Sequence, residues 1–340
     1  MNSSEVKKFL EENAKKVTPL IEEILVSEVD DRNKNAIKYP ISTGGKRVRP
    51  GLVVASCRMF DGKEEDVLYA AAGLEILHNY SLIIDDMIDH SSLRRKKPTC
   101  WAEFGKSMAE CVGIDYAASI FQGAIKSRRP IEVADILART MKTLVDGEIL
   151  DILFEQSGRD NEPFVRKNRF KRIEDEDYFE MVNKKTSALI QSSCEIGAML
   201  AGAKEEEIEL LRKYGFGFGL AYQIQDDILD IFGEQEVFGK KKGQDIKEGK
   251  LGNIVILYAL RELSSSDKKK FLEIIRNEDA KEEEIEEAIN LIEKTNSKER
   301  TCKLAENFVK EAKGNLDHLP KNEWNDILRI MADFVIKREK

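Results

Sequence analysis

The chain has 340 residues, of which 41% are hydrophobic, and its 63 acidic and 55 basic side chains leave a formal net charge of −8. This length and composition suit a globular protein with a real core, and the acidic balance argues against a nucleic-acid-binding surface. No stretch forms a signal peptide or approaches about 18 apolar residues in a row, so we expect a cytoplasmic protein without stable membrane insertion. Five cysteines without metal-ligand spacing are typical of reduced thiols.

Apolar residues recur at helical spacing from one end of the chain to the other. Leu10, Val17, Ile21 and Ile24 follow this spacing near the start, and seven prolines leave long stretches free for helices. No clear two-residue alternation is present, so no strands are expected. The predicted fold is an all-α bundle of antiparallel helices forming a single domain over residues 1–340. Breaks are expected at 39–51, 94–99, 155–172, 232–245 and 264–270.

Two similar segments, LIIDDMIDH and YQIQDDILDI, place aspartates inside apolar runs. On a helix, Asp85 and Asp89 share a face about 6 Å apart, and so do Asp226 and Asp230. Unpaired carboxylates are costly to bury, so they either face water or are held by a cation, and oxygen ligands completed by water or phosphate favour Mg²⁺. A solvated charged stripe is the alternative for one segment, but the apolar flanks and the repetition weaken it.

Basic loops accompany these segments. GGKRVRP places Lys46 and Arg49 beside glycines that allow the backbone to approach an anion. LRRKKP follows the first aspartate segment, and GKKKGQDIKEGK follows the second. Each basic run alone is typical of a solvated surface. An aspartate-rich helix followed twice by a basic loop favours a site that neutralises a diphosphate.

The motifs GGKRVRP, LEILHNYSLIIDDMID, LRRKKPT, KKTSALI, YQIQDDILD and GKKKGQDIKEGK, in this order and spacing, resemble the trans-isoprenyl diphosphate synthases of the polyprenyl synthetase family. The resemblance covers roughly residues 40–260. It implies an isoprenoid-synthase bundle around a deep central cavity, usually in a homodimer. The implied reaction condenses an allylic diphosphate of C5, C10 or C15 length with isopentenyl diphosphate, with Mg²⁺ as cofactor.

The resemblance also implies a role for individual residues. Metal ligation falls to Asp85, Asp89 and Asp226. Support of the metal through water or neighbouring ligands falls to Asp86, Asp227 and Asp230. Contacts with the allylic diphosphate fall to Arg94, Lys185, Lys240 and Lys250. Contacts with isopentenyl diphosphate fall to Lys46, Arg49, His78 and Arg95, although a histidine on an apolar helix is more commonly a core residue. The catalytic groups are Lys185, Thr186 and Gln223, of which Thr186 and Gln223 would face the allylic carbon as its charge develops.

Product length is expected to depend on the residues that precede the first aspartates. Tyr80 lies five positions before Asp85, which is about 7.5 Å along a helix, and its ring could close the floor of an apolar tunnel. Ser81 and Leu77 are smaller than the residues that usually accompany a C15 limit. The resemblance favours an archaeal-type geranylgeranyl diphosphate synthase (C20), with farnesyl (C15) or C25 products as alternatives. Packing in the core is the alternative for Tyr80.

Several positions depart from the family pattern. Ile84 replaces a frequent His, Lys96 a Gly, Trp101 a His, Ile114 a Gly and Glu148 a Gln. The loop 156–177 also looks longer than is usual. These departures keep open a non-catalytic partner subunit of a prenyl synthase. The complete aspartate motifs argue against that reading, because a non-catalytic chain has no physical reason to keep paired carboxylates in apolar surroundings. A terpene cyclase is less consistent with a second aspartate motif and with GGKRVRP.

Overall fold

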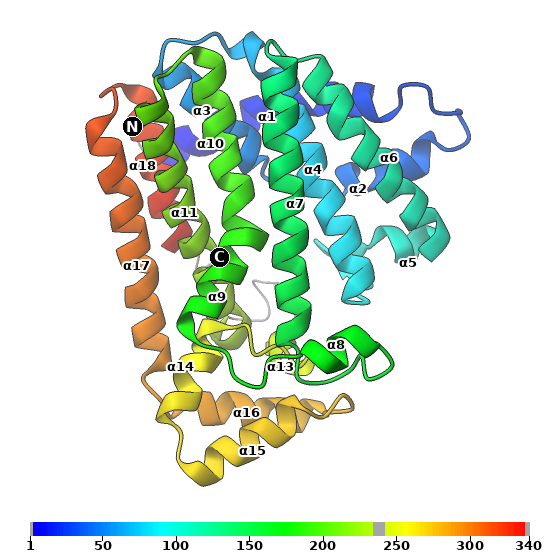
Figure 1. Cartoon of the computed structure of the whole chain (residues 1–340), viewed down its shortest axis with the longest axis vertical. Coiled ribbons are helices and arrows are strands. Elements are labelled where there is room, and N and C mark those ends of the chain that lie inside the picture. The colour runs from blue at the N-terminus through cyan, green and yellow to red at the C-terminus, as the bar shows by residue number, and fades with distance from the viewer. Residues whose placement is uncertain (1–2, 234–241, 337–340) are drawn as a thin grey trace. The chain divides into compact units, whose positions relative to one another are not determined.

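The computed structural model describes residues 3–233 and 242–336, and helices make up most of this part of the chain (Figure 1). The all-α prediction is confirmed. Tertiary contacts divide the chain into two compact units. The first unit is Met1–Leu144, Ala188–Phe216 and Ala312–Ala332, and the second is Val145–Ser187, Gly217–Glu311 and Asp333–Lys340.

The first unit contains the first aspartate segment. Its elements are α1 (Ser3–Leu25), α2 (Lys34–Ser42), α3 (Val48–Met59), η1 (Glu64–Asp66), α4 (Leu68–Ile88), β1 (Leu93–Arg94), β2 (Lys97–Pro98), α5 (Cys100–Phe104), α6 (Lys106–Ile125), α10 (Ala188–Ala201) and η3 (Leu316–His318). The second unit holds α8 (Pro163–Asn168), α9 (Asp175–Val182), the π-helical turn η2 (Asn183–Ser187), α13 (Gln244–Lys247), α14 (Ile254–Glu262), α15 (Ser265–Ile275) and α16 (Glu282–Glu293). Both units draw residues from α7 (Pro130–Phe154), α11 (Glu205–Phe232), α17 (Ser297–Asn315) and α18 (Glu323–Ile336).

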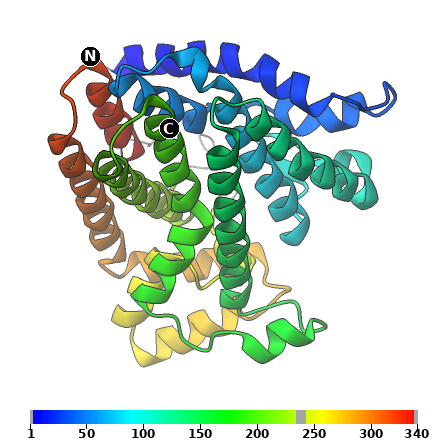
Figure 2. The same cartoon turned by 45° about the horizontal axis from the view of Figure 1, so that its top comes forward.

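Helix α4 is the centre of the first unit. It packs against α6 on one side and also contacts α1, α3 and α10 (Figures 1 and 2). Its sequence is apolar on every side, and Leu74, Ile76 and Leu77 are fully buried. Contact with α6 is especially close at two glycines, because a Cβ on Gly123 would lie 2.7 Å from the Cα of Gly73. This packing buries most of α4 and leaves its aspartate-bearing end to form the site.

The prediction that no strands form is wrong at one place. β1 and β2 pair in antiparallel register, Leu93 with Pro98 and Arg94 with Lys97. The loop between them consists of Arg95 and Lys96, whose φ angles are +53° and +64°. Two left-handed residues are what a tight hairpin of this kind requires, usually supplied by Asn or Gly. The sequence signal was missed because Arg and Lys occupy both positions.

Two expected breaks are shorter than predicted. In 39–51, Pro40 lies within α2 and Pro50 lies in the first turn of α3, where a proline is tolerated, so the loop is confined to 43–47. In 264–270, α15 already begins at Ser265, because Ser264 caps the helix by accepting a hydrogen bond from the Asp267 N–H at 3.2 Å. The expected break at 232–245 includes residues 234–241, which lie outside the described part of the chain. Among the described helices, none has a sufficiently long apolar stretch for a bilayer crossing.

Candidate active site

The first aspartate cluster lies at the carboxyl end of α4. Asp85 and Asp86 are in the last turn and Asp89 is the C-cap residue, whose N–H donates to the Asp85 carbonyl at 2.9 Å. Asp85 and Asp89 are half-buried, whereas Asp86 is only 5% exposed. The predicted one-turn spacing of Asp85 and Asp89 is therefore present, and both carboxylates can be reached by solvent.

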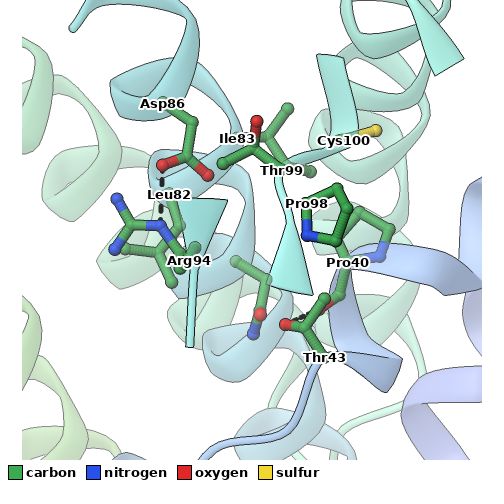
Figure 3. A pocket seen from close by; sticks show the side chains of 10 residues that line it. Pro40, Thr43, Leu82, Ile83, Asp86, Arg94, Pro98, Thr99 and Cys100 are labelled. Carbon is green, nitrogen blue, oxygen red and sulfur yellow. Dashed lines mark hydrogen bonds and ion pairs between the residues drawn. The ribbon is translucent and has the colours of Figure 1, made fainter. Parts of the chain in front are cut away.

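Arg94 is placed by the hairpin against this cluster. Its Nη2 donates to Asp85 Oδ2 at 2.9 Å and its Nε donates to Asp86 Oδ1 at 2.8 Å (Figure 3 draws the contact with Asp86). Burial works against the charged guanidinium, but Asp86 and Asp85 outweigh it and raise the pKa of Arg94. Arg94 therefore supplies a fixed positive charge at the edge of the carboxylate pair.

Trp101 secures the end of α4 from α5. Its indole Nε1–H lies 2.9 Å from the carbonyl oxygens of both Asp86 and Ser91. The Asp86 carbonyl also accepts from the Ser91 N–H and the Ser91 carbonyl from the Thr99 hydroxyl, so the indole adds a second donor to each oxygen and ties α5 to the end of α4. Trp101 departs from the family pattern, yet it still offers a ring N–H at this place.

A small pocket lies beside Arg94, between α2, α4 and the hairpin (Figure 3). Its volume is about 20 Å³, and its polar lining includes Thr43, Asn79, Asp86 and Arg94. This is room for one water molecule but not for a substrate. The pocket is consequently a packing feature of the hairpin and not a binding cavity.

The GGKRVRP loop is held by an arginine that the sequence analysis did not single out. Arg47 is 5% exposed and Glu75, on α4, is 2% exposed. Arg47 Nη1 donates to Glu75 Oε1 at 3.0 Å, and its Nη2 donates to the carbonyl of Ile41 at 2.9 Å. Arg47 also has a left-handed backbone, with φ at +48°. This buried pair joins the loop to α4, and no local signal distinguishes Arg47 from Arg49.

The four residues expected to contact isopentenyl diphosphate all belong to the first unit. Arg49 Nη1 lies 3.1 Å from His78 Nε2, and Arg95 Nη1 donates to the carbonyl of Gly44. Lys46 is in the same loop and is exposed. Burial, then Arg49 and Arg95, hold the pKa of His78 well below its usual range. A guanidinium can only donate, so neutral His78 accepts at Nε2 and carries its proton on Nδ1.

The residues expected to set product length are placed differently from one another. Leu77 is fully buried in the core of the first unit. Tyr80 is half-buried, and its Cε2 lies 4.0 Å from the position of a Cβ on Gly113 of α6, where Ile84 lies at 3.4 Å. Ser81 donates to the carbonyl of His78 at 2.8 Å. The Tyr80 ring and the Ile84 side chain of α4 thus approach α6 at Gly113, where the missing side chain leaves room for them.

The second aspartate cluster lies on α11 and is organised by Asp227, which is 2% exposed. Its Oδ2 accepts from the Tyr178 hydroxyl at 2.8 Å and from the Ile254 N–H at 3.0 Å. Its Oδ1 accepts from Gln223 Nε2 at 3.0 Å. Burial, and then the charge of Asp245, raise the pKa of Asp227 well above its usual range. Asp227 therefore joins α11 to α9 and α14 through buried hydrogen bonds. Its neighbour Asp226 remains half-buried.

Asp230 binds the backbone at the start of α13. Its two carboxylate oxygens accept from the N–H groups of Gln244 at 3.0 Å and Asp245 at 3.2 Å, at the start of α13. Burial, and then Asp245, raise the pKa of Asp230 well above its usual range. The pairing of Asp226 with Asp230 proposed from helical spacing therefore joins two residues with unlike surroundings.

Lys185 and Thr186 lie in the π-helical turn η2, a distortion that is frequent at functional sites. Thr186 Oγ1 donates to Gln223 Oε1 at 3.0 Å, which extends the Asp227 network to the turn. Helix α11 packs closely against η2, because a Cβ on Gly219 would lie 2.5 Å from the Cα of Ser187. Helix α7 makes a similar approach through Gly147, where a Cβ would lie 2.4 Å from the Lys185 nitrogen.

Two lysines expected to bind the allylic diphosphate share one carboxylate. Lys185 Nζ lies 2.6 Å from Asp151 Oδ2, and Lys250 Nζ lies 3.7 Å from the same oxygen. Glu148, one of the departures from the family pattern, brings Oε2 to 2.8 Å from Lys185 Nζ. Lys240, which was also expected to contact the allylic diphosphate, lies outside the described residues.

The acidic residues suit a hard cation. Within residues 3–233 and 242–336, no three acidic, His or Cys side chains converge closely enough to hold a metal by themselves. Half-buried carboxylates such as those of Asp85, Asp89 and Asp226 could bind Mg²⁺ only with water or substrate oxygens completing the shell. That is the usual way in which proteins bind Mg²⁺ together with phosphates.

Comparison with known proteins gives a consistent result. The family model described as Polyprenyl synthetase matches residues 30–292. A short chain isoprenyl diphosphate synthase of Methanocaldococcus jannaschii is 38% identical, with 82% of each chain covered. A geranylfarnesyl diphosphate synthase of Natronomonas pharaonis is 30% identical, with 99% of each chain covered. The crystal structure of a geranylgeranyl pyrophosphate synthetase from Pyrococcus horikoshii superposes with a TM-score of 0.87 at 28% identity, covering 98% of this chain and 99% of that one.

Proposed function

The chain belongs to the polyprenyl synthetase family, a family of prenyl-transferring enzymes, and on this basis we propose that it condenses an allylic diphosphate with isopentenyl diphosphate to form a short-chain all-trans prenyl diphosphate. The observation that carries the proposal is the pairing of the first aspartate cluster with a fixed cation. Arg94 donates to Asp85 and Asp86, and in the second unit Lys185 and Lys250 lie 2.6 and 3.7 Å from one oxygen of Asp151 on α7.

We propose that Asp85, Asp89 and Asp226 ligate Mg²⁺, which when bound supplies positive charge to a departing diphosphate. Arg94, Lys185, Lys240 and Lys250 contact the same diphosphate. Asp86 orients Arg94 through the 2.8 Å hydrogen bond, and Asp227 holds the second cluster through Tyr178. A cation held in place in this way, such as Arg94, stabilises developing negative charge without reorganising during the reaction.

Departure of the diphosphate leaves an allylic cation, and Thr186 and Gln223 are the proposed polar groups beside it. Asp227 fixes Gln223, and Gln223 accepts the hydrogen bond from Thr186, so both side chains are oriented before substrate arrives. Apolar walls exclude water from the cation. Attack by the double bond of isopentenyl diphosphate forms the new bond, and the released diphosphate takes the proton that is then lost.

Isopentenyl diphosphate is proposed to bind at the GGKRVRP loop. Lys46, Arg49 and Arg95 supply the positive charge, and His78 supports Arg49 through the 3.1 Å contact. Because His78 is neutral, it orients the guanidinium without adding a charge of its own. A neutral partner does not cancel the positive charge of Arg49, which is the charge proposed to contact the diphosphate.

We propose geranylgeranyl diphosphate (C20) as the product, with farnesyl (C15) and C25 products as alternatives. The Pyrococcus horikoshii protein is described as a geranylgeranyl synthetase and the Natronomonas pharaonis protein as a geranylfarnesyl synthase, so relatives of both lengths are similar to this chain. The position of the Tyr80 ring against Gly113 supports a tunnel floor on α4.

Replacing Tyr80 with Ser tests this floor. Loss of the ring should open space beside Gly113 and lengthen the main product by at least one five-carbon unit. Chromatography of dephosphorylated products measures the length. If the distribution stays unchanged, the floor is elsewhere on the tunnel wall.

We further propose that the chain acts as one domain, as a cytoplasmic homodimer. The family match at 30–292 runs through residues of both units, which supports a single domain. An exposed apolar stripe on α6 supports the homodimer. Its members recur every three or four residues and are Met108, Cys111, Ile114, Ala118, Phe121 and Ile125. Ile114, a departure from the family pattern, is 72% exposed and extends this stripe.

The function is tested by incubating the purified chain with labelled isopentenyl diphosphate and each of the three allylic starters, with Mg²⁺ or with a chelator. We expect a Mg²⁺-dependent prenyl product. Asp85→Ala and Asp226→Ala should each abolish it while circular dichroism stays unchanged, and Asp135→Ala on α7 is the matched control. Absence of elongation by the unmodified chain with every starter would favour the non-catalytic partner subunit instead.

A further inference from the structure

The segment Pro163–Arg172, sequence PFVRKNRFKR, carries an unusual charge for this protein. It contains five basic residues and no acidic one, although the whole chain has a net charge of −8. It includes α8 and lies on the connection between α7 and α9 (Figures 1 and 2). None of the steps proposed for the reaction uses it.

The segment is anchored to the end of α7 and is therefore not a loose tail. The Phe170 N–H donates to the Leu153 carbonyl at 2.9 Å, and the rings of Phe154 and Phe170 pack edge to face with centroids 5.0 Å apart. Gln156 Nε2 donates to the Phe170 carbonyl at 2.9 Å, and Val165 is buried. The backbone that carries the basic side chains is thus preorganised.

Three of the cations are available to a partner. Arg166, Lys167 and Lys171 are exposed, and their side chains make no hydrogen bond or ion pair with any residue that the structure describes. The other two basic residues are engaged locally, since Arg169 donates to the Gly158 carbonyl at 2.5 Å and Arg172 lies 2.5 Å from Glu174. These three side chains therefore present positive charge without a described counter-charge, although Asp160, Glu162 and Glu174 flank the segment.

An exposed aromatic ring accompanies these charges. Phe164 is 66% exposed on α8, next to buried Val165 and within three residues of Lys167. A solvated basic loop gains nothing from an exposed phenyl ring. Aromatic rings among lysines and arginines are characteristic of segments that lie in the headgroup region of an anionic bilayer.

We propose that Phe164, Arg166, Lys167 and Lys171 form a peripheral docking site for an anionic lipid surface. The preference for lipid over an acidic protein rests on the proposed function, because a prenyl diphosphate of C20 length is amphiphilic and would itself partition into a bilayer surface. Docking there shortens the path of the product. The site binds reversibly, because three charges and one ring supply far less than a spanning helix.

Sedimentation with vesicles tests the proposal without substrate, so its outcome is independent of the reaction. The unmodified chain should partition onto phosphatidylcholine vesicles that contain phosphatidylglycerol, should bind pure phosphatidylcholine weakly, and should be released by salt. The triple variant Arg166→Glu, Lys167→Glu and Lys171→Glu should lower the partition coefficient by more than about two orders of magnitude, because each lost basic residue accounts for roughly fivefold and the added carboxylates are repelled by the anionic surface. Its condensation rate in solution should be unchanged.

A matched control carries the same change of charge elsewhere. Lys268→Glu, Lys303→Glu and Lys310→Glu alter three exposed lysines that also lack described ion pairs, and partitioning should fall far less. Phe164→Ser keeps every charge and should still weaken vesicle binding. Equal losses in both triple variants would overturn the proposal. So would a Phe164→Ser chain that binds as tightly as the original, or retention on immobilised heparin without vesicle binding, which would indicate an acidic macromolecule.

Discussion

Single residues decide how the cations of the first unit are presented. Arg47 and Arg49 are two positions apart in GGKRVRP, yet Arg47 is buried against Glu75 and Arg49 is half-buried against His78. The buried pair positions the loop, and Arg49 is the arginine proposed to contact isopentenyl diphosphate. A buried ion pair adds little to the free energy of unfolding, because desolvation offsets the attraction. Removing one partner is strongly destabilising, because the other charge stays buried without compensation.

We therefore expect either Arg47→Met or Glu75→Leu alone to lower the free energy of unfolding by about 3–5 kcal/mol. The double variant should recover most of this loss, because no buried charge is left without its partner. Urea denaturation of the two single variants and the double variant measures the coupling. Additive losses would mean that the two side chains do not depend on each other.

The hairpin loop carries local backbone strain at Arg95 and Lys96, and Lys96 offers the simpler test. Lys96 has a φ of +64°, a conformation that disfavours side chains with a Cβ. Lys96→Gly should raise the free energy of unfolding by about 0.5–1 kcal/mol, because glycine adopts this conformation readily. Lys97→Gly is the matched control, since Lys97 lies in β2 and should gain nothing. A destabilised Lys96→Gly chain would show that contacts of the lysine outweigh the strain.

At the scale of elements, the π-helical turn η2 is the feature that brings Lys185 and Thr186 to their places. It is held by helices that approach through Gly147 and Gly219. A regular helix through KKTSALI would rotate the residues that follow, so the direction of Thr186 towards Gln223 depends on this turn. The glycines are therefore part of the site although they carry no functional group.

Gly219→Ala should disturb this arrangement. Its Cβ would lie 2.5 Å from the Ser187 Cα, so the turn must shift, at a cost of about 1–3 kcal/mol in stability and with a fall in kcat. Gly314→Ala is the control, because nothing lies within 4 Å of a Cβ there, and it should stabilise α17 by up to about 1 kcal/mol. Unchanged kcat in Gly219→Ala would remove the role proposed for the turn.

At the scale of the whole molecule, the exposed apolar stripe on α6 is the surface proposed for the homodimer. Ile114, Phe121 and Ile125 are 72%, 49% and 69% exposed, and the residues between them on the same face are uncharged. Such a face of regular helical spacing is the pattern by which helices pack across an interface. A second copy of the chain is the partner proposed.

The double variant Ile114→Glu and Phe121→Glu should shift the protein to monomers, because four carboxylates would be buried across a symmetric interface. Light scattering after size-exclusion chromatography measures the mass. Phe164→Glu places the same change on α8, at an exposed ring outside the stripe, and should leave the mass unchanged. A double variant with the mass of the unmodified chain would place the interface elsewhere.

The sequence by itself determined the helical class, the two aspartate segments and the basic loops beside them. These depend on local information: helical spacing shows which residues share a face, and charge among apolar neighbours shows where chemistry is needed. Asp85, Asp89 and Arg94 therefore could be named in advance. The hairpin could not, because its left-handed positions hold Arg and Lys in place of the glycine or asparagine that signals such a turn.

Only the tertiary structure decided which members of each motif are buried against distant partners and which stay accessible. Asp226 and Asp227 are identical and adjacent, yet Asp227 is buried because Tyr178, 49 positions away, and Ile254, 27 positions away, donate to it. Arg47 is distinguished from Arg49 by Glu75, 28 positions away. The residue pattern within a segment does not predict such partners. Burial and hydrogen bonding depend on the distant residues that packing brings into contact.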